Sequence, residues 1–163
     1  MSEFSKRSQS LAERLGRQCL EMAVSVTAAE SCTGGSVAAA ITDIAGSSDW
    51  FETGYVTYSN AAKTRLLGVS EALLAQHGAV SQAVVEAMVE GACADSGAQA
   101  GVAISGVAGP GGGSAEKPVG TVWLAWRAGG RVDARCCHFE GDRIAVRQQA
   151  VITALEGLLE RLS

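Results

Sequence analysis

Hydrophobic positions near both ends of the chain recur with the period of an amphipathic helix. The first set, which follows a polar start, is Leu11, Leu15, Cys19 and Met22. The second set, which follows Asp142, is Ile144, Val151, Ile152, Leu155, Leu159 and Leu162. Because residues three or four apart share one face of a helix, each set predicts a helix with an apolar side.

Five short segments between these helices have the composition or the alternation of β-strands. The expected strands are residues 24–29, 50–58, 101–105, 119–126 and 132–139. The fourth is apolar on both faces, so we expect it to be a covered, central strand. The Ala128-Gly129-Gly130 sequence then turns the chain back, which predicts a hairpin between the fourth and fifth strands.

Further helices are predicted between the strands by hydrophobic spacing and by capping residues. The expected segments are residues 37–45 before Gly46, residues 60–67, a turn from Ser70 to Gly78, and a longer helix from Ser81 to about Gly97. Strands that alternate with helices, together with one hairpin, predict an α/β fold. We expect a single domain over residues 1–163, a mixed β-sheet of about five strands covered by helices on both faces, with its ligand at the strand ends.

Composition and charge narrow the classes of function. Glycine accounts for 20 of the 163 residues, above the usual ~7%, which favours a ligand site with close backbone approach. A net charge of −4 without a basic stripe argues against nucleic acid as a partner. Residues 96–115 carry no charge, but their glycines and Pro110 would leave backbone groups unsatisfied in lipid, so we expect no membrane segment.

The N-terminal sequence and the cysteines indicate the compartment. The first ten residues lack the apolar run of a signal peptide, and the five cysteines have no CxxC spacing. We therefore expect a cytoplasmic protein without disulfides. Cys136 and Cys137 are adjacent on a strand and point to opposite faces, so they cannot jointly bind a metal, and no metal site is predicted. No cofactor is expected either.

The segment from Glu30 to Gly35 is the first candidate site. It places hydroxyl residues and two glycines where a strand turns into a helix, whose free N–H groups attract negative charge. Ser31 is a candidate nucleophile there, although a serine at such a junction is more often a helix cap. Glu30 can pair locally. Cys32 is better interpreted as a small buried residue, because no suitable histidine accompanies it.

A serine nucleophile needs a base. Neither His77, before a glycine stop, nor His138, within a strand, has the context of a catalytic triad. Lys63 follows an uncharged, hydroxyl-rich run and is one of three lysines, the others being Lys6 and Lys117. It would have to be buried to act as a base, and its spacing fits neither the Ser-x-x-Lys nor the Tyr-x-x-x-Lys pattern. Any Ser–Lys pair must therefore form through the fold.

A second glycine cluster runs from Ser105 to Ser114. It follows an expected strand and could present backbone N–H groups to a phosphate, or it could be a flexible surface loop. Gly112 stands where a Walker loop needs lysine, and no dinucleotide-binding fingerprint opens a helix.

Five motifs in order resemble the nicotinamide-nucleotide amidohydrolase (PncC) family, which is similar to the C-terminal domain of CinA. The motifs are Ala29-Glu-Ser-Cys-Thr-Gly-Gly, Ile44-Ala-Gly-Ser-Ser, Tyr55-Val-Thr-Tyr-Ser-Asn-Ala-Ala-Lys63, Ser105-Gly-Val-Ala-Gly-Pro-Gly-Gly-Gly and Lys117-Pro-Val-Gly-Thr-Val. The resemblance spans nearly the whole chain and implies the stand-alone amidase form, which hydrolyses the carboxamide of nicotinamide mononucleotide to nicotinate mononucleotide and ammonia in pyridine nucleotide recycling.

The resemblance also implies roles for single residues. It makes Ser31 the nucleophile, Lys63 the base, and Tyr58 a hydroxyl that orients groups or relays a proton. The residues implied to line the nucleotide pocket are Thr33, Gly34, Gly35, Ser48, Asn60, Ser105, Gly106 and Gly109, with Arg143 and Arg147 from a Gly-Asp-Arg-x-x-x-Arg segment. One arginine would hold the phosphate. The family often has threonine in place of Ser105, and the hydroxyl is kept.

These inferences give geometric expectations and leave alternatives open. We expect Ser31 in the first turn of a helix, its Oγ near the Lys63 amine, with Gly34 or Gly35 N–H groups facing the same space. The alternatives are a catalytically silent nucleotide-binding regulatory module, and an esterase or amidase of other specificity. Proteins of this family and size commonly form homo-oligomers, so a homo-oligomer is expected.

Overall fold

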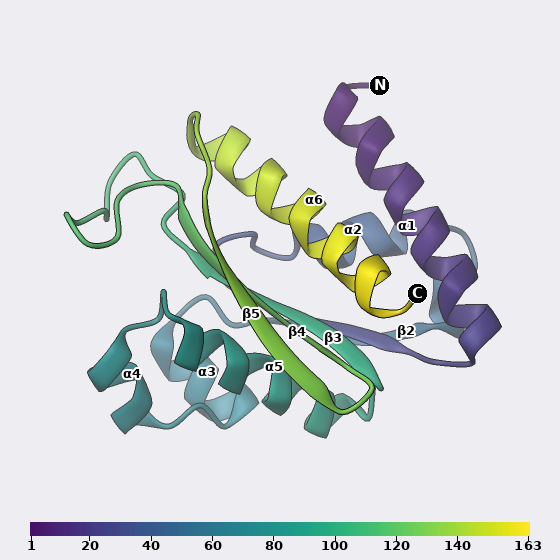
Figure 1. Ribbon diagram of the computed structural model, residues 1–163, viewed down its shortest axis with the longest axis horizontal. Coiled ribbons are helices and arrows are strands. Elements are labelled where there is room, and N and C mark those ends of the chain that lie inside the picture. The colour runs from purple at the N-terminus through teal and green to yellow at the C-terminus, as the bar shows by residue number, and fades with distance from the viewer.

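A five-stranded sheet runs through the middle of the computed structural model, which describes residues 1–163 (Figure 1). Its strands are β1 (Val26–Glu30), β2 (Phe51–Val56), β3 (Ala100–Gly106), β4 (Thr121–Ala128) and β5 (Arg131–His138). They lie in the order β2-β1-β3-β4-β5. Strand β1 is parallel to β2 and β3, whereas β4 is antiparallel to β3 and β5. The mixed sheet expected from the sequence is confirmed.

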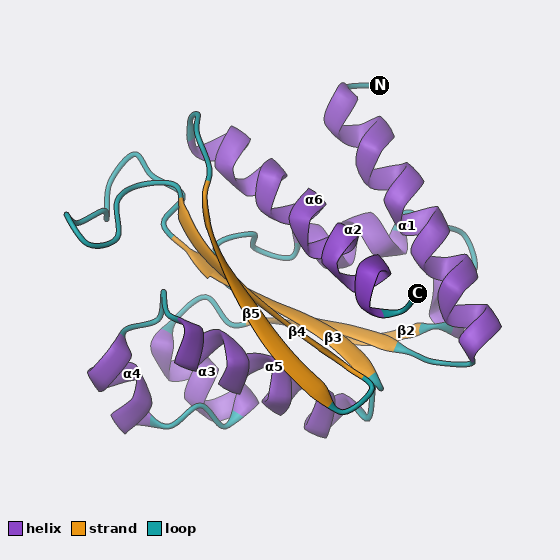
Figure 2. Ribbon diagram, viewed as in Figure 1, coloured by secondary structure: helices purple, strands orange, loops and turns teal.

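Helices cover both faces of the sheet (Figure 2). One layer holds α1 (Glu3–Met22), α2 (Ser36–Thr42) and α6 (Arg143–Arg161), and the other holds α3 (Asn60–Leu67), α4 (Glu71–His77) and α5 (Gln82–Ser96). A short 3₁₀ turn over Ser47–Asp49 precedes β2. No helix is long and apolar enough to cross a membrane.

Each face of the sheet has its own hydrophobic core, because successive side chains of a strand point to opposite faces. On β3, Val102 and Ile104 join the core under α1 and α6, and Ala103 joins the core under α5. Ala103 pairs in register with Ala29 on β1 and with Ala125 on β4. This row of small side chains lets α5 pack close to the sheet.

The sequence predicted most elements to within a few residues. The helix over residues 60–67 is confirmed, and β4 lies between two strands as expected of a covered strand. The first strand begins at Val26 instead of residue 24, and α2 covers Ser36–Thr42 instead of residues 37–45. Ser70 and Ser81 cap α4 and α5, with their hydroxyl oxygens accepting from Leu73 N and Val84 N. All five cysteines are free.

Close packing of α5 against the end of α3 gives a test of the fold. A Cβ added at Gly91 would lie 1.9 Å from the backbone oxygen of Leu67. On helix propensity alone, Gly91→Ala would raise the free energy of unfolding by up to ~1 kcal/mol. Because of the clash, we expect Gly91→Ala to lower the free energy of unfolding by about 1–3 kcal/mol instead. Urea denaturation measures it. Gly111→Ala, where no atom lies within 4 Å of the added Cβ, is the control, and stabilisation by Gly91→Ala would contradict the packing.

Candidate active site

A pocket of about 340 Å³ opens at the carboxyl ends of β1 and β3. Parallel strands bring these ends to one edge of the sheet, which is where open α/β sheets bind their ligands. The lining residues come from the turn after β1, the start of α3, the loop before α5, the glycine cluster after β3, and the start of α6. They are Ser31, Cys32, Tyr58, Asn60, Lys63, Ala79, Val80, Ser105, Gly106, Val107, Ala108, Gly109, Gly111, Gly112 and Arg143.

The fold brings Lys63 to the candidate nucleophile Ser31, although the two residues are 32 positions apart in the sequence. Its Nζ lies 3.1 Å from Ser31 Oγ and 2.8 Å from the backbone oxygen of Thr57. The backbone oxygen of Tyr58 lies 3.5 Å from the same amine. Lys63 is 1% exposed and Ser31 8% exposed. The expected pairing of the two side chains is present in the structure.

Burial changes the acid–base behaviour of Lys63. Desolvation lowers the pKa of the amine from its ordinary 10.5, because the charged form loses its hydration. Lys63 takes part in none of the ion pairs of the protein. A neutral amine has two N–H groups and a lone pair, so two backbone carbonyls can take the N–H groups while the lone pair faces the Ser31 hydroxyl.

The local sequence explains why α3 points Lys63 inward. The Ser59 hydroxyl oxygen accepts from Ala62 N at 3.0 Å and begins the helix, and Gly68 ends it with φ +71°. Lys63 and Leu67 are the buried residues of this helix, four positions apart on one face. The amine is therefore carried into the protein on the same face that packs α3 onto the core.

Two expectations for the turn after β1 are wrong. Ser31 lies outside any helix, and α2 begins only at Ser36. The N-terminus of α2 is also not free for a substrate anion. The Glu30 carboxylate, 1% exposed, accepts from Val37 N at 2.9 Å and Ala38 N at 3.0 Å, and from the Thr33 hydroxyl at 2.6 Å. The protein thus supplies its own anion to this helix.

Cys32 is no competing nucleophile. It is 6% exposed, and burial raises the pKa of its thiol to about 11. Because the thiolate is the reactive form, the thiol stays protonated and unreactive near neutral pH. This agrees with its interpretation as a small buried residue.

Arg143 and Tyr58 meet at the rim of the pocket. Arg143 donates to the backbone oxygen of Gly109 at 2.8 Å and to the Tyr58 hydroxyl at 3.0 Å. Tyr58 is 61% exposed, and its hydroxyl is bonded to Arg143 while its backbone oxygen faces Lys63. The start of α6 is thereby tied to both the β2–α3 connection and the glycine cluster.

The structure gathers eight of the thirteen residues named from the sequence around this pocket. They are Ser31, Tyr58, Asn60, Lys63, Ser105, Gly106, Gly109 and Arg143. The other five, Thr33, Gly34, Gly35, Ser48 and Arg147, do not line it. Thr33 bonds to Glu30, Ser48 is exposed on the 3₁₀ turn, and Arg147 donates to backbone oxygens of the turn that contains Gly34 and Gly35.

Sequence reasoning missed the Thr57 carbonyl and the lining residues Ala79 and Val80. A backbone carbonyl leaves no mark in a sequence, and small apolar residues in a loop look like ordinary connections. His77 and His138 lie outside the pocket. No group of three His, Cys, Asp or Glu side chains is placed to hold a metal ion.

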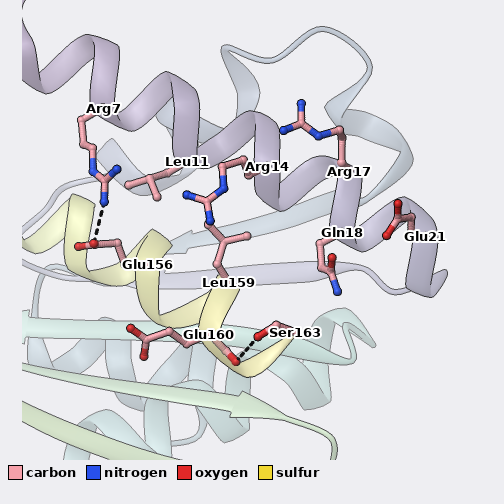
Figure 3. A pocket seen from close by; sticks show the side chains of 10 residues that line it. All are labelled: Arg7, Leu11, Arg14, Arg17, Gln18, Glu21, Glu156, Leu159, Glu160 and Ser163. Carbon is pink, nitrogen blue, oxygen red and sulfur yellow. Dashed lines mark hydrogen bonds and ion pairs between the residues drawn. The ribbon is translucent and has the colours of Figure 1, made fainter.

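A larger recess of about 520 Å³ lies between α1 and α6, away from this chemistry (Figure 3). Arg7, Arg14 and Arg17 line it from α1, and Arg7 is paired with Glu156 at 2.9 Å. It contains no buried nucleophile or base. The smaller pocket around Ser31 is therefore the candidate active site.

Known proteins resemble this chain along almost its whole length. A Pseudomonas putida protein named nicotinamide-nucleotide amidohydrolase PncC is 65% identical over 150 residues, which cover 92% of this chain and 94% of that protein. The protein of the same name from Escherichia coli strain K12 is 55% identical over 153 residues, covering 93% of this chain and 92% of its own.

The fold has close counterparts among solved structures. The competence/damage inducible protein CihA from Agrobacterium tumefaciens matches with a TM-score of 0.96 and 44% identity over 100% of both chains. Residues 8–162 match the family described as the CinA C-terminal domain. The chain therefore belongs to the CinA C-terminal domain family.

Proposed function

We propose that the protein hydrolyses the carboxamide of nicotinamide mononucleotide to nicotinate mononucleotide and ammonia, in pyridine nucleotide recycling. The observation that carries this proposal is the buried Lys63 amine, 3.1 Å from Ser31 Oγ in the wall of a pocket. The names of relatives at 65% and 55% identity support the substrate class.

In the proposed mechanism, Ser31 Oγ attacks the carboxamide carbon while its proton passes to the lone pair of Lys63. The carbonyl electron pair moves to the oxygen, forming a tetrahedral intermediate. Collapse of the intermediate breaks the C–N bond, and Lys63 returns its proton to the departing ammonia. Water then attacks the acyl-serine, giving its proton to Lys63, which protonates Ser31 as it leaves. No metal or cofactor takes part in these proposed steps.

The other residues would hold the nucleotide. Asn60, Ser105, Gly106 and Gly109 lie around the pocket and are proposed to contact it. Arg143 is the only arginine in the lining and is proposed to bind the phosphate. The Tyr58 hydroxyl would orient that guanidinium, to which it is already bonded at 3.0 Å.

We place this reaction in the cytoplasm, with a small-molecule nucleotide as the partner and neither nucleic acid nor membrane. The net charge of −4 argues against nucleic acid as a partner, and the five free cysteines suit a reducing compartment. A homo-oligomer remains our prediction, to be checked by light scattering.

Ammonia release from nicotinamide mononucleotide by the purified protein, without added metal, tests the proposal. Turnover is expected. The silent-module alternative predicts that the nucleotide raises the melting temperature without ammonia release. An esterase or amidase of other specificity would hydrolyse nicotinamide riboside as well as the nucleotide, since it would have no need of the phosphate.

Replacing the nucleophile separates chemistry from binding. Ser31→Ala is expected to abolish turnover and to keep the nucleotide-induced rise in melting temperature, because the phosphate is held elsewhere. Turnover above about one hundredth of the wild-type rate would reject Ser31 as the nucleophile.

The pH dependence tests Lys63 as the base. Because the neutral amine is the active form and burial lowers its pKa, kcat/KM should rise with pH through an apparent pKa below 10.5. Lys63→Arg keeps the positive charge but cannot deprotonate, so it should be nearly as damaging as Lys63→Ala. If the arginine variant keeps substantial activity, Lys63 acts only as a fixed charge.

The phosphate contact is tested with two substrates. Arg143→Gln should raise KM for nicotinamide mononucleotide about tenfold or more and change kcat/KM for nicotinamide riboside much less, since the riboside has no phosphate. Arg7→Gln, remote from the pocket, is the control. Equal losses on both substrates would contradict a phosphate role.

A further inference from the structure

The turn after β1 holds a backbone N–H, that of Cys32, from which no other residue accepts a hydrogen bond. Gly34 N donates to the Ser31 backbone oxygen at 3.0 Å and closes a turn over residues 31–34. The N–H of Cys32, inside this turn, donates to no other residue and reaches only the thiol of Cys32 itself, although Cys32 is only 6% exposed. Buried N–H groups are almost always paired, and Cys32 lines the same pocket as Ser31. This donor is therefore available to a ligand.

The peptide units on both sides of Cys32 are fixed. On one side the Ser31 oxygen is bonded to Gly34 N. On the other side the Cys32 oxygen accepts from Arg147 Nε at 3.0 Å. Because a trans peptide points its N–H opposite to its carbonyl, the Cys32 N–H points away from Gly34.

Arg147 approaches the turn from the Gly34 side. Its Nη2 donates to the Thr33 oxygen at 3.2 Å, and a Cβ at Gly34 would lie 3.2 Å from the same nitrogen. Gly34 has φ +60°, so glycine suits both the turn and the arginine that packs on it. Arg147 thus contacts the turn from outside the pocket and holds two of its carbonyls away from the substrate.

We infer that the Cys32 N–H is the oxyanion donor of the reaction and that Arg147 is the positioning residue that fixes it. The inference rests on the proposed function. When Ser31 Oγ bonds to the carboxamide carbon, the carbonyl electron pair moves to the oxygen, and the Cys32 N–H donates to that developing negative charge. Arg147 touches neither substrate nor reacting atoms. Of the two N–H groups expected from the sequence to serve here, that of Gly34 is occupied by the Ser31 oxygen, and Gly35 does not line the pocket.

A tetrahedral analogue separates this role from substrate binding. The probe is nicotinamide mononucleotide with its carboxamide replaced by a boronic acid, which forms an anionic tetrahedral adduct with a serine. A lost oxyanion donor typically lowers kcat about 100-fold or more. Arg147→Gln should lower kcat by roughly that factor and weaken boronate binding in parallel, with KM changed less than about threefold. Arg147→Lys has a point charge instead of a planar guanidinium, so its kcat and its boronate affinity should lie between those of the wild type and of Arg147→Gln.

The matched control is Arg161→Gln on the same helix, whose guanidinium pairs with Asp133 far from the pocket. It should lose stability and keep both kcat and boronate affinity. A raised KM with unchanged kcat in Arg147→Gln would mean that Arg147 binds substrate and would overturn the inference. A lowered kcat with unchanged boronate affinity would overturn it as well.

An NMR measurement on the wild-type protein needs no variant to fold. Boronate binding should shift the Cys32 amide proton resonance strongly downfield, because this N–H gains a hydrogen bond to an oxyanion. The chemical shift of the Gly34 amide proton should change little. An unmoved Cys32 resonance in the bound protein would overturn the inference. Ammonia release by the wild-type protein reports the proposed function separately, so the two failures are distinguishable.

Discussion

Burial of one amine beside one hydroxyl is the constraint on which the site depends. A lysine removed from water without an anion cannot hold its proton as firmly as a lysine in water, and it becomes a base by that loss. The protein places the Lys63 amine against Ser31 Oγ and a backbone carbonyl, with no carboxylate to restore its charge. The packing of α3 and the bonds to the turn after β1 keep this arrangement in place.

The two partners come from different parts of the fold, Lys63 from a helix and Ser31 from a turn at the end of a sheet strand, and they are fixed by different means. Lys63 enters on α3, which packs against α5 where Gly91 allows close contact. Ser31 lies on a turn held at two ends. The Glu30 carboxylate ties the turn to the start of α2, and the Arg147 guanidinium ties it to α6. The buried carboxylate and the arginine thus stabilise the turn without facing the pocket themselves.

Local sequence rules predicted most of the helices and strands, whereas the family resemblance named the residues of the site. Serine caps, glycine stops and hydrophobic periods placed α3, α4 and α5 to within a residue or two, because these rules act between near neighbours. The Ser–Lys contact spans 32 positions and follows no short motif. The family resemblance named Ser31 and Lys63, but their contact is formed by tertiary packing, which local rules do not describe.

Two differences between the sequence expectations and the structure have the same physical origin. The glycines after Ser31 look like a helix N-terminus open to an anion, but a side chain from the same strand end, Glu30, fills it. Arg147 belongs to a motif that implies substrate binding, yet its bonds go to backbone oxygens of the turn. Both facts depend on where a carboxylate and a guanidinium reach after folding, which spacing along the chain does not reveal.

The most direct test of the central claim is the titration of Lys63 itself in the free protein. The chain has three lysines, so ¹³C labelling of their ε carbons gives a short spectrum, and Lys63→Arg assigns the resonance of interest. Lys63 should titrate clearly below its ordinary value of 10.5, with its amine neutral in the pH range where activity is full. If Lys63 titrates at or above that ordinary value, Lys63 is no base, and the account of the site is wrong.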